Sequence, residues 1–241
     1  LGDVYKRQKY YSYSRASKYY KATSHNKVKT MILYNGNLKI SQVFYPLLGV
    51  LEVILRNRIH REMAFMYSDK NWIINQKTGF MSDKSLTKKD KRTGKSITND
   101  YLLKEVVSAE KKLKKKGVTS ILAGQIIAEQ TLGFWTSFFD VPYYRILKGA
   151  PTKAFKYLPA GYGRKDISNT LFEIREFRNR IFHNEPVCFV NNKIDFSYAR
   201  SIYASIINIL VWIDPKIKTS LLEIDRVLKV IDDEERKQNN P

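Results

Sequence analysis

The sequence predicts an all-α fold, and three observations lead to this prediction. Apolar residues recur at spacings of three and four through most of the chain, as on the buried face of amphipathic helices. Glycines and prolines separate these periodic segments. Alternating strand patterns are scarce, apart from a possible turn with short strands near 187–194. The 241 residues suffice for a substantial core. We expect one helical domain over 9–236, followed by a polar tail over 237–241.

The N-terminal part begins with LGDVYKRQ (1–8), which resembles a translated sequencing-library linker. We expect these residues to be non-native and the true start to be missing, because the chain has no initiating Met. Residues 9–29 are polar and rich in tyrosine and lysine. They predict a short amphipathic helix that packs its tyrosines on the body; the alternative is an aromatic and cationic segment that stacks on bases.

Asn35-Gly36 predicts a turn, and 41–67 predicts a long helix. Pro46 is expected in the first turn of that helix or at a kink. Residues 68–99, rich in Ser, Thr, Asn, Gly and Lys, predict an exposed, mobile basic loop. Gly94-Lys95-Ser96 resembles the end of a phosphate-binding P-loop, but that motif requires a glycine where Lys89 stands, so it is rejected.

The second half of the chain predicts further helices. The segment 101–117 reads as a helix with a cationic C-terminal end and a glycine stop, and 120–140 as a mostly buried helix. Short helical pieces separated by prolines lead to Ser168, which can cap a helix through residues 175–183. Two more helices, about 196–213 and 216–236, are separated at Asp214-Pro215.

The chain carries 43 Lys and Arg against 23 Asp and Glu, a formal charge of +20. This balance favours a polyanionic partner, with nucleic acid first and an anionic membrane surface second. A soluble protein that is basic without such a partner is the alternative. Cys188 is the only cysteine, which excludes an intramolecular disulfide and a cysteine-based zinc site. We expect no metal or other cofactor and a cytoplasmic location. The apolar run 202–213 is too short to span a bilayer, and no signal peptide is visible.

The segment REFRNRIFHNEP (175–186) carries the residue types of a metal-independent ribonuclease. RNA cleavage by its own 2′-OH needs an acid, a base and a cation at the phosphate. His183 can exchange protons near neutrality, Arg178 offers a charged planar fork, and Asn179 can orient either. On an ideal helix Arg178 and His183 are roughly 140° apart and do not converge. Pro186 predicts that the helix ends near His183. At a fraying end the imidazole can swing toward Arg178, or a symmetric partner copy can supply the missing group.

A second segment, LRNRIH (55–60), repeats the RNRI sequence. Glu52, Arg56 and His60 follow one another at intervals of four, with Asn57 beside Arg56. The repeat can be chance, and the stripe can be a solvent-facing ion pair. The functional alternative is a polar strip that faces the other RNRI segment and supports it, with Glu52, Arg56, Asn57 and Glu185 as supporting residues.

The blocks SRASKYY, MILYNGNLKISQVFYPLLGVLEVILRNRI, LGFWTSFF and FRNRIFHNEPV, in this order, resemble the Abi-like (abortive infection) proteins of the HEPN superfamily. The superfamily signature is an Arg with a polar neighbour, four to six residues, and a His; Arg178, Asn179 and His183 match it. The resemblance implies a HEPN-like multi-helix bundle and metal-independent endoribonuclease activity, often in a homodimer. It also implies a role in phage defence or toxin-like growth arrest, with a neutralising antitoxin as a further partner.

This chain departs at Asn184 from the family that it resembles, whose members commonly show a second histidine there. A non-catalytic RNA-binding or sensing module is therefore the alternative function, and an ordinary helix end the structural one. We expect RNA to contact the basic loop and the lysine run that follows it, through Lys88, Lys89, Lys91, Arg92, Lys111, Lys112, Lys114, Lys115 and Lys116.

Overall fold

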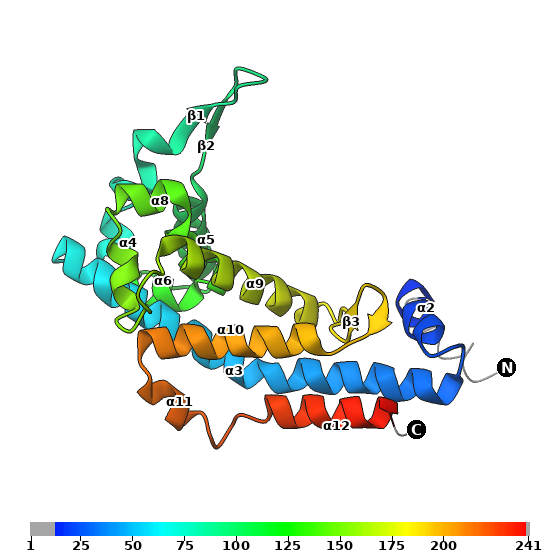
Figure 1. Cartoon of the computed structure of the whole chain (residues 1–241). Coiled ribbons are helices and arrows are strands. Elements are labelled where there is room, and N and C mark those ends of the chain that lie inside the picture. Colours follow the sequence, from blue (N-terminus) through cyan, green and yellow to red (C-terminus); the bar gives the residue numbers. More distant parts are fainter. Residues whose placement is uncertain (1–12, 240–241) are drawn as a thin grey trace. The chain divides into compact units, whose positions relative to one another are not determined.

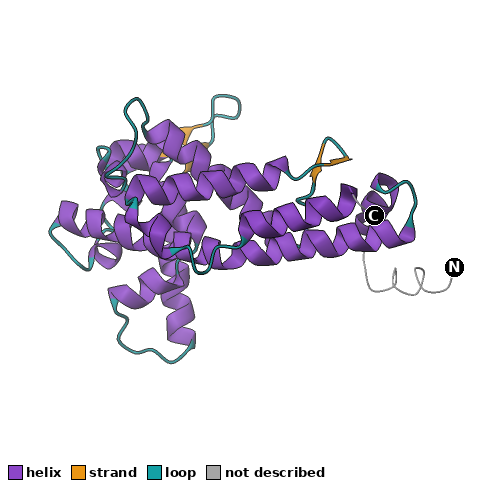
Figure 2. Cartoon of the chain, turned by 60° about the horizontal axis from the view of Figure 1, so that its bottom comes forward, coloured by secondary structure: helices purple, strands orange, loops and turns teal. Residues whose placement is uncertain are grey.

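The computed structural model describes residues 13–239, and the chain is mostly helical, with 68% helix and 4% strand. Helices dominate Figure 2, where the strands form only short hairpins. The predicted all-α character is therefore confirmed at this level. The linker-like residues 1–8, with Tyr10 and Tyr11, lie outside the described residues.

The chain divides into two compact units, and each unit is discontinuous in sequence. Unit 1 comprises Leu1–Val50, Glu173–Asn208 and Lys216–Pro241, and unit 2 comprises Leu51–Phe172 and Ile209–Pro215. Three helices run through both: α3 (Lys27–Tyr67), α9 (Arg164–Phe182) and α10 (Ser197–Ile213). The expectation of one domain over 9–236 stays a prediction.

Unit 1 is built around the first half of α3. The ring of Phe44 meets Phe177 of α9 edge-on, with centroids 4.6 Å apart, and Phe177 meets Tyr198 of α10. Helix α12 (Val227–Asn239) lies against the same group, because Arg200 of α10 binds two of its carboxylates. Figure 1 shows the first parts of α3 and α10 running beside α12. Helix α2 (Tyr13–Ala22), the short helix α11 (Lys216–Ser220) and the hairpin of β3 (Phe189–Val190) and β4 (Lys193–Ile194) complete the unit.

The predicted turn at Asn35-Gly36 is wrong, because both residues lie inside α3, which begins well before the predicted start at residue 41. A Cβ at position 36 would lie 2.9 Å from Oε2 of Glu234, so this glycine allows α12 to approach α3 closely. Pro46 lies in the helix interior, and both it and Gln42 are exposed. Water can therefore reach the Gln42 carbonyl, which has no N–H partner at Pro46. The predicted helix near 9–29 is confirmed as α2, which buries Tyr19.

Unit 2 packs short helices around an aromatic core. Its α-helices after α3 are α4 (Trp72–Asn75), α5 (Tyr101–Lys115), α6 (Ala123–Glu129), α7 (Leu132–Thr136) and α8 (Val141–Ile146). Four 3-10 turns join them: η1 (Phe80–Ser82), η2 (Lys84–Leu86), η3 (Ser137–Phe139) and η4 (Ala150–Ala154). The buried rings of Trp72, Phe80, Phe134, Trp135, Phe138 and Tyr143 contact one another in its centre.

The prediction of one exposed loop over 68–99 is wrong for the first part of the segment, and the predicted mobility stays a prediction. Trp72, Phe80 and Leu86 are buried, and β1 (Thr87–Lys89) pairs antiparallel with β2 (Ser96–Thr98). The Asp90 carboxylate closes the turn between the strands by accepting backbone N–H bonds from Arg92 and Thr93. Those bonds, with one from the Thr93 hydroxyl, lower the pKa of Asp90. The exposure expected for this basic segment is confirmed, because residues 87–98 are exposed apart from the half-buried Asp90.

Three helix boundaries also differ from the expectations. The segment 120–140 breaks at Gln130, whose side-chain amide donates to the Ile126 carbonyl at the end of α6. Helix α9 begins at Arg164 rather than at Ser168, and Asp166 accepts a bond from the Gly163 N–H. The segment 216–236 breaks between α11 and α12. The expected polar tail is helical as far as residue 239.

Asp225 explains the break between α11 and α12. Its carboxylate accepts bonds from the Val227 N–H that opens α12 and from the Tyr203 hydroxyl. Burial and the Asp225 carboxylate together raise the pKa of Tyr203 to about 12.

Helix α3 is, among the described residues, the one helix long and apolar enough to cross a membrane by length and composition. The apolar run weighed from the sequence, 202–213, lies in a different helix, α10. Buried core helices meet the same criterion. In unit 2, α3 buries Leu51, Leu55, Ile59 and Met63 at helical spacing and exposes Arg61, the pattern of a core helix.

Candidate active site at the end of helix α9

The last turns of α9 are anchored by an apolar stripe. Ile174, Phe177 and Ile181 are fully buried at spacings of three and four, and Phe177 contacts rings on both α3 and α10. The residues between them, Arg178 and Asn179, are half-buried at the edge of this stripe. Burial of one face therefore leaves the other residues of this turn at the surface of unit 1.

Helix α9 ends in a Schellman motif. The Glu185 N–H donates to the Arg180 carbonyl (2.8 Å), and the Asn184 N–H donates to the Ile181 carbonyl (3.1 Å). Asn184 has φ +51°, in the left-handed region that asparagine tolerates better than most residues. His183 is the last residue whose N–H bonds one turn back, to Asn179 (3.1 Å), and its side chain is exposed. The predicted helix end near His183 is confirmed.

Asn184 therefore has a backbone role at the position where the resemblance stated above leads us to expect a second histidine. Its positive φ is needed for both closing hydrogen bonds. Asparagine suits the left-handed backbone of this helix end, and the departure from the expected signature leaves Arg178, Asn179 and His183 in place.

Arg178 lies against an aromatic ring instead of a carboxylate. Its guanidinium carbon is 4.1 Å from the centroid of Phe182, a cation–π contact one turn along the helix. The Phe182 ring in turn meets Tyr45 of α3 edge-on, at 4.9 Å. This contact directs the guanidinium toward the last turn, the turn that carries His183. The direction of the guanidinium depends on the side-chain rotamer of Arg178. The angular positions of Cα atoms on an ideal helix do not determine that rotamer.

Asn179 and His183 lie one turn apart on the neighbouring face of the helix. Within the described residues, the side chains of Arg178, Asn179 and His183 have no hydrogen-bond or ion-pair partner. A cation, an amide and an imidazole therefore stand in adjacent turns, accessible and available to a ligand.

Arg180 and Glu185 have a different role. The Arg180 Nη2 donates to the Pro186 carbonyl (3.0 Å), and its Nε lies 3.5 Å from a Glu185 carboxylate oxygen, an ion pair without hydrogen-bond geometry. Glu185, expected to support the site, therefore contacts Arg180 rather than the matching signature residues. The hydrogen bond from Arg180 to Pro186 joins the last turn of α9 to the chain that leaves it.

Asn37, which no sequence motif singled out, secures the same segment from α3. Its side chain is fully buried; Oδ1 accepts a bond from the Val187 N–H (2.7 Å), and Nδ2 lies 3.4 Å from the Glu185 carbonyl. A signal was present in the sequence, because Asn37 lies four residues after Leu33 and three before Ile40, both buried. A polar residue within such a stripe requires a partner.

The first RNRI segment belongs to unit 2, so the strip expected to face the α9 end stays a prediction. In this segment, His60 has a structural contact: its Nδ1 accepts a bond of 2.9 Å from the buried indole of Trp72. Burial lowers the pKa of His60, which favours the neutral imidazole that this bond requires. Glu52 and Arg56 are half-buried and Asn57 is exposed.

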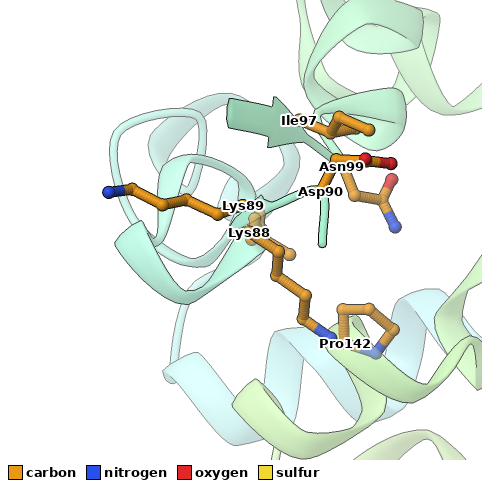
Figure 3. A pocket seen from close by; sticks show the side chains of 7 residues that line it. Lys88, Lys89, Asp90, Ile97, Asn99 and Pro142 are labelled. Carbon is orange, nitrogen blue, oxygen red and sulfur yellow. The ribbon is translucent and has the colours of Figure 1, made fainter. Parts of the chain in front are cut away.

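The first group of expected nucleic-acid contacts in unit 2 consists of the cations on the β1–β2 hairpin. Lys88 extends toward Pro142 of α8, while Lys89 points the other way, as neighbours on a strand do (Figure 3). Between the hairpin and Pro142 lies an open pocket of about 260 Å³, lined by Leu86, Ile97 and Asn99 as well. The hairpin presents Lys88, Lys89, Lys91 and Arg92, all exposed.

The lysine run at the end of α5 is partly neutralised. Lys112 and Lys116 bind the two carboxylate oxygens of Glu129, at 2.5 and 2.7 Å, and these bonds lower the pKa of Glu129. Lys111, Lys114 and Lys115 are exposed and form no ion pair with an acidic side chain among the described residues. Two of the five expected lysine contacts are therefore engaged within the chain.

Among residues 13–239, no group of three or more His, Cys, Asp or Glu side chains is placed to hold a metal ion. Comparison of the chain with protein-family models, curated proteins and solved structures finds no match. Membership in the Abi-like family thus stays a prediction from the sequence blocks quoted above.

Proposed function

We propose that the protein is a metal-independent endoribonuclease whose site is Arg178, Asn179 and His183. The observation that carries this proposal is the state of these three side chains. They share adjacent turns of one helix end, are accessible and have no polar partner among the described residues, whereas neighbouring Arg180 and Glu185 are engaged with the chain. The three side chains are therefore available to contact a phosphate, as the proposal requires.

The reaction forms a bond between the ribose 2′ oxygen and phosphorus and breaks the bond from phosphorus to the 5′ oxygen. His183 exchanges a proton with one of these oxygens, because neutral and charged imidazole are both accessible near pH 7. Arg178 binds the phosphate oxygens, and the Asn179 amide orients the phosphate or the imidazole. The products are a 2′,3′-cyclic phosphate and a 5′-hydroxyl.

One imidazole cannot both remove the 2′ proton and protonate the leaving oxygen in a single concerted step. By resemblance to the HEPN superfamily, we propose that a second copy supplies the other group and that the chain acts as a homodimer. The same resemblance supports a HEPN-like bundle, a cytoplasmic role in phage defence or growth arrest, and a neutralising antitoxin. Sedimentation that shows a fully active monomer at micromolar concentration would contradict the homodimer.

The test is cleavage of RNA by purified protein in EDTA. His183→Ala is expected to slow cleavage by about 10²- to 10⁴-fold with little change in RNA affinity. Arg178→Ala is expected to reduce both turnover and binding of the phosphate. His25→Asn serves as a control, because it removes another exposed histidine of unit 1 and asparagine tolerates the left-handed backbone at this position. Folding of each variant is verified by circular dichroism and thermal melting.

Loss of cleavage in EDTA and its return with Mg²⁺ would contradict the mechanism. A second candidate function, RNA binding without cleavage, is favoured by the exposed cations of the β1–β2 hairpin. Salt-dependent RNA binding by a protein that cleaves nothing, with or without Mg²⁺, would select this second function.

A further inference from the structure

Two exposed aromatic side chains adjoin the signature residues. Phe182 is 49% exposed and Tyr45 is 38% exposed, although each has a large apolar ring. They come from different helices, α9 and α3, and their rings meet edge-on at 80°, with centroids 4.9 Å apart. The Tyr45 hydroxyl also lies 3.5 Å from the Ile181 carbonyl, which ties this ring to the end of α9.

The contacts of Phe182 leave part of its ring accessible. The Arg178 guanidinium lies over the ring, and Tyr45 meets it edge-on. With about half of the side chain exposed, the surface beyond these two contacts faces solvent. The buried stripe of α9 uses the preceding residue, Ile181, so the fold does not require an aromatic ring at position 182.

The position of Phe182 relates it to all three signature residues. At about 100° per residue, Phe182 lies about 40° from Arg178, 60° from Asn179 and 100° from His183 around the helix. Its ring therefore stands between the cation that would bind a phosphate and the column of Asn179 and His183. A planar group stacked on this ring would therefore belong to the same ligand as the group that Arg178 binds.

We propose that Phe182 and Tyr45 form a stacking platform for one nucleobase next to the scissile phosphate. The inference rests on the proposed ribonuclease function and names a substrate-positioning element for it. Aromatic rings stack on any base, so the platform would position the RNA strand without selecting sequence. The cation beside the ring would then bind the phosphate of the same nucleotide.

Charge and size favour a nucleobase as the occupant of this aromatic pair. The Arg178 guanidinium lies over one ring of the pair, and the chain carries +20. Such a surface attracts an anion such as the phosphate backbone of RNA. Two partly exposed rings also fall far short of the roughly 800 Å² that each partner of a stable protein interface buries.

The experiment uses oligonucleotides with one ribonucleotide in a deoxyribose strand, so that cleavage occurs at one known phosphate. An abasic residue replaces the base on the 5′ or the 3′ side of that phosphate. For the wild-type protein, one of the two abasic substrates is expected to show kcat/KM lower by about 5- to 100-fold. For Phe182→Leu, the intact substrate should be slowed similarly, and the abasic residue should then have little further effect.

This coupling separates stacking from mere support of Arg178, because a misplaced guanidinium would slow all substrates by the same factor. Phe65→Leu, which changes an exposed phenylalanine of unit 2, is the matched control and should keep the full abasic effect. Thermal melting shows whether Phe182→Leu is folded. The inference is overturned if, at both abasic positions, the loss of kcat/KM caused by Phe182→Leu and the loss caused by the abasic residue multiply as independent effects do.

Binding to the same strands with 2′-O-methyl ribose at the scissile position makes failure of the two proposals distinguishable. If no RNA is cleaved but affinity still shows the coupling, the ribonuclease proposal fails and the platform stands as an RNA-binding element. If cleavage is normal and Phe182→Leu changes only the sedimentation of the protein, the aromatic pair is a contact between copies and the platform is refuted.

Discussion

The indole N–H of Trp72 donates a hydrogen bond of 2.9 Å to Nδ1 of His60, and the two rings stack with centroids 6.2 Å apart. Trp72 is fully buried, so its N–H has no access to water. His60→Ala is expected to lower the free energy of unfolding by about 1–3 kcal/mol, because a buried donor is left without its acceptor. His60→Gln, which can retain an acceptor, should be less destabilised. Denaturant unfolding measures both, and cleavage per folded molecule should remain within a few-fold of wild type.

The same histidine predicts a dependence of stability on pH. Burial lowers the pKa of His60 below 6.5, so below that pH the unfolded chain binds a proton that the folded chain resists. The contribution of this group to stability is complete above pH 6.5 and declines as the pH falls from 6.5 toward the folded-state pKa. Between pH 7.5 and 5.5, the stability of wild type should therefore fall further than that of His60→Gln. An equal fall in the two proteins would show that His60 is not the responsible group.

Asn37 is expected to be the most costly polar position of α3. Asn37→Ala removes the acceptor of the buried Val187 N–H and should lower the free energy of unfolding by about 1–3 kcal/mol. It should also loosen the segment that follows His183, which hydrogen exchange at Glu185 and Val187 would detect. Asn35→Ala is the matched control, since Asn35 is exposed two residues earlier in the same helix. No difference between the two variants would contradict this role.

Asn184 is expected to tolerate glycine and to reject β-branched residues. Its φ of +51° is strained for valine, so Asn184→Val should destabilise the helix end by about 1–2 kcal/mol. Asn184→Gly keeps the backbone and removes the side chain, and it should retain nearly full cleavage activity. An Asn184→Gly protein that is folded but inactive would show that this side chain takes part in the reaction. Thermal melts and cleavage rates on the same samples distinguish these cases.

The lysines of α5 offer a matched pair of double variants. Lys112→Ser with Lys116→Ser removes cations already bound to Glu129, whereas Lys111→Ser with Lys115→Ser removes cations outside that ion pair. The second variant should flatten the salt dependence of single-strand RNA binding more, by about 0.7 in slope for each phosphate that is no longer neutralised. Replacing Lys88, Lys89, Lys91 and Arg92 by Ser tests the hairpin in the same assay. Unchanged slopes would mean that RNA binds neither surface.

The helices whose ends carry strong signals were predictable from the sequence. Gly117, with φ +83°, follows the end of α5, and Pro215 follows α10, so both segments end where expected. The sequence predicts one helix over 120–140, whereas the structure has a break at Gln130. The segments on both sides of the break are rich in apolar residues and give no boundary signal. The β1–β2 hairpin was missed because its strands have three residues each and no buried face. Periodicity carries no information for elements this short.

At the α9 end, the sequence indicated the residue types and the helix terminus but not the arrangement around them. Asn37 lies 150 residues away from Val187, and no local pattern connects the two. The contact of Arg178 with Phe182 depends on a side-chain rotamer, which sequence spacing does not determine. The sequence Asn35-Gly36 predicts a turn, whereas in the structure Gly36 allows the close approach of Glu234. This contact is also distant in sequence, so no local pattern reveals it.

These long-range contacts have a consequence for synthesis of the protein on the ribosome. Asn37 can accept its hydrogen bond only after Val187 has been synthesised, and Lys39 pairs with Glu234, 195 residues later. At about 5–20 residues per second, the apolar side of nascent α3 stays uncovered for roughly ten seconds or more, a time when chaperones can bind it. The end of α9 is therefore fixed against α3 only after Val187 has been synthesised, and Lys39 of α3 gains its partner on α12 later still.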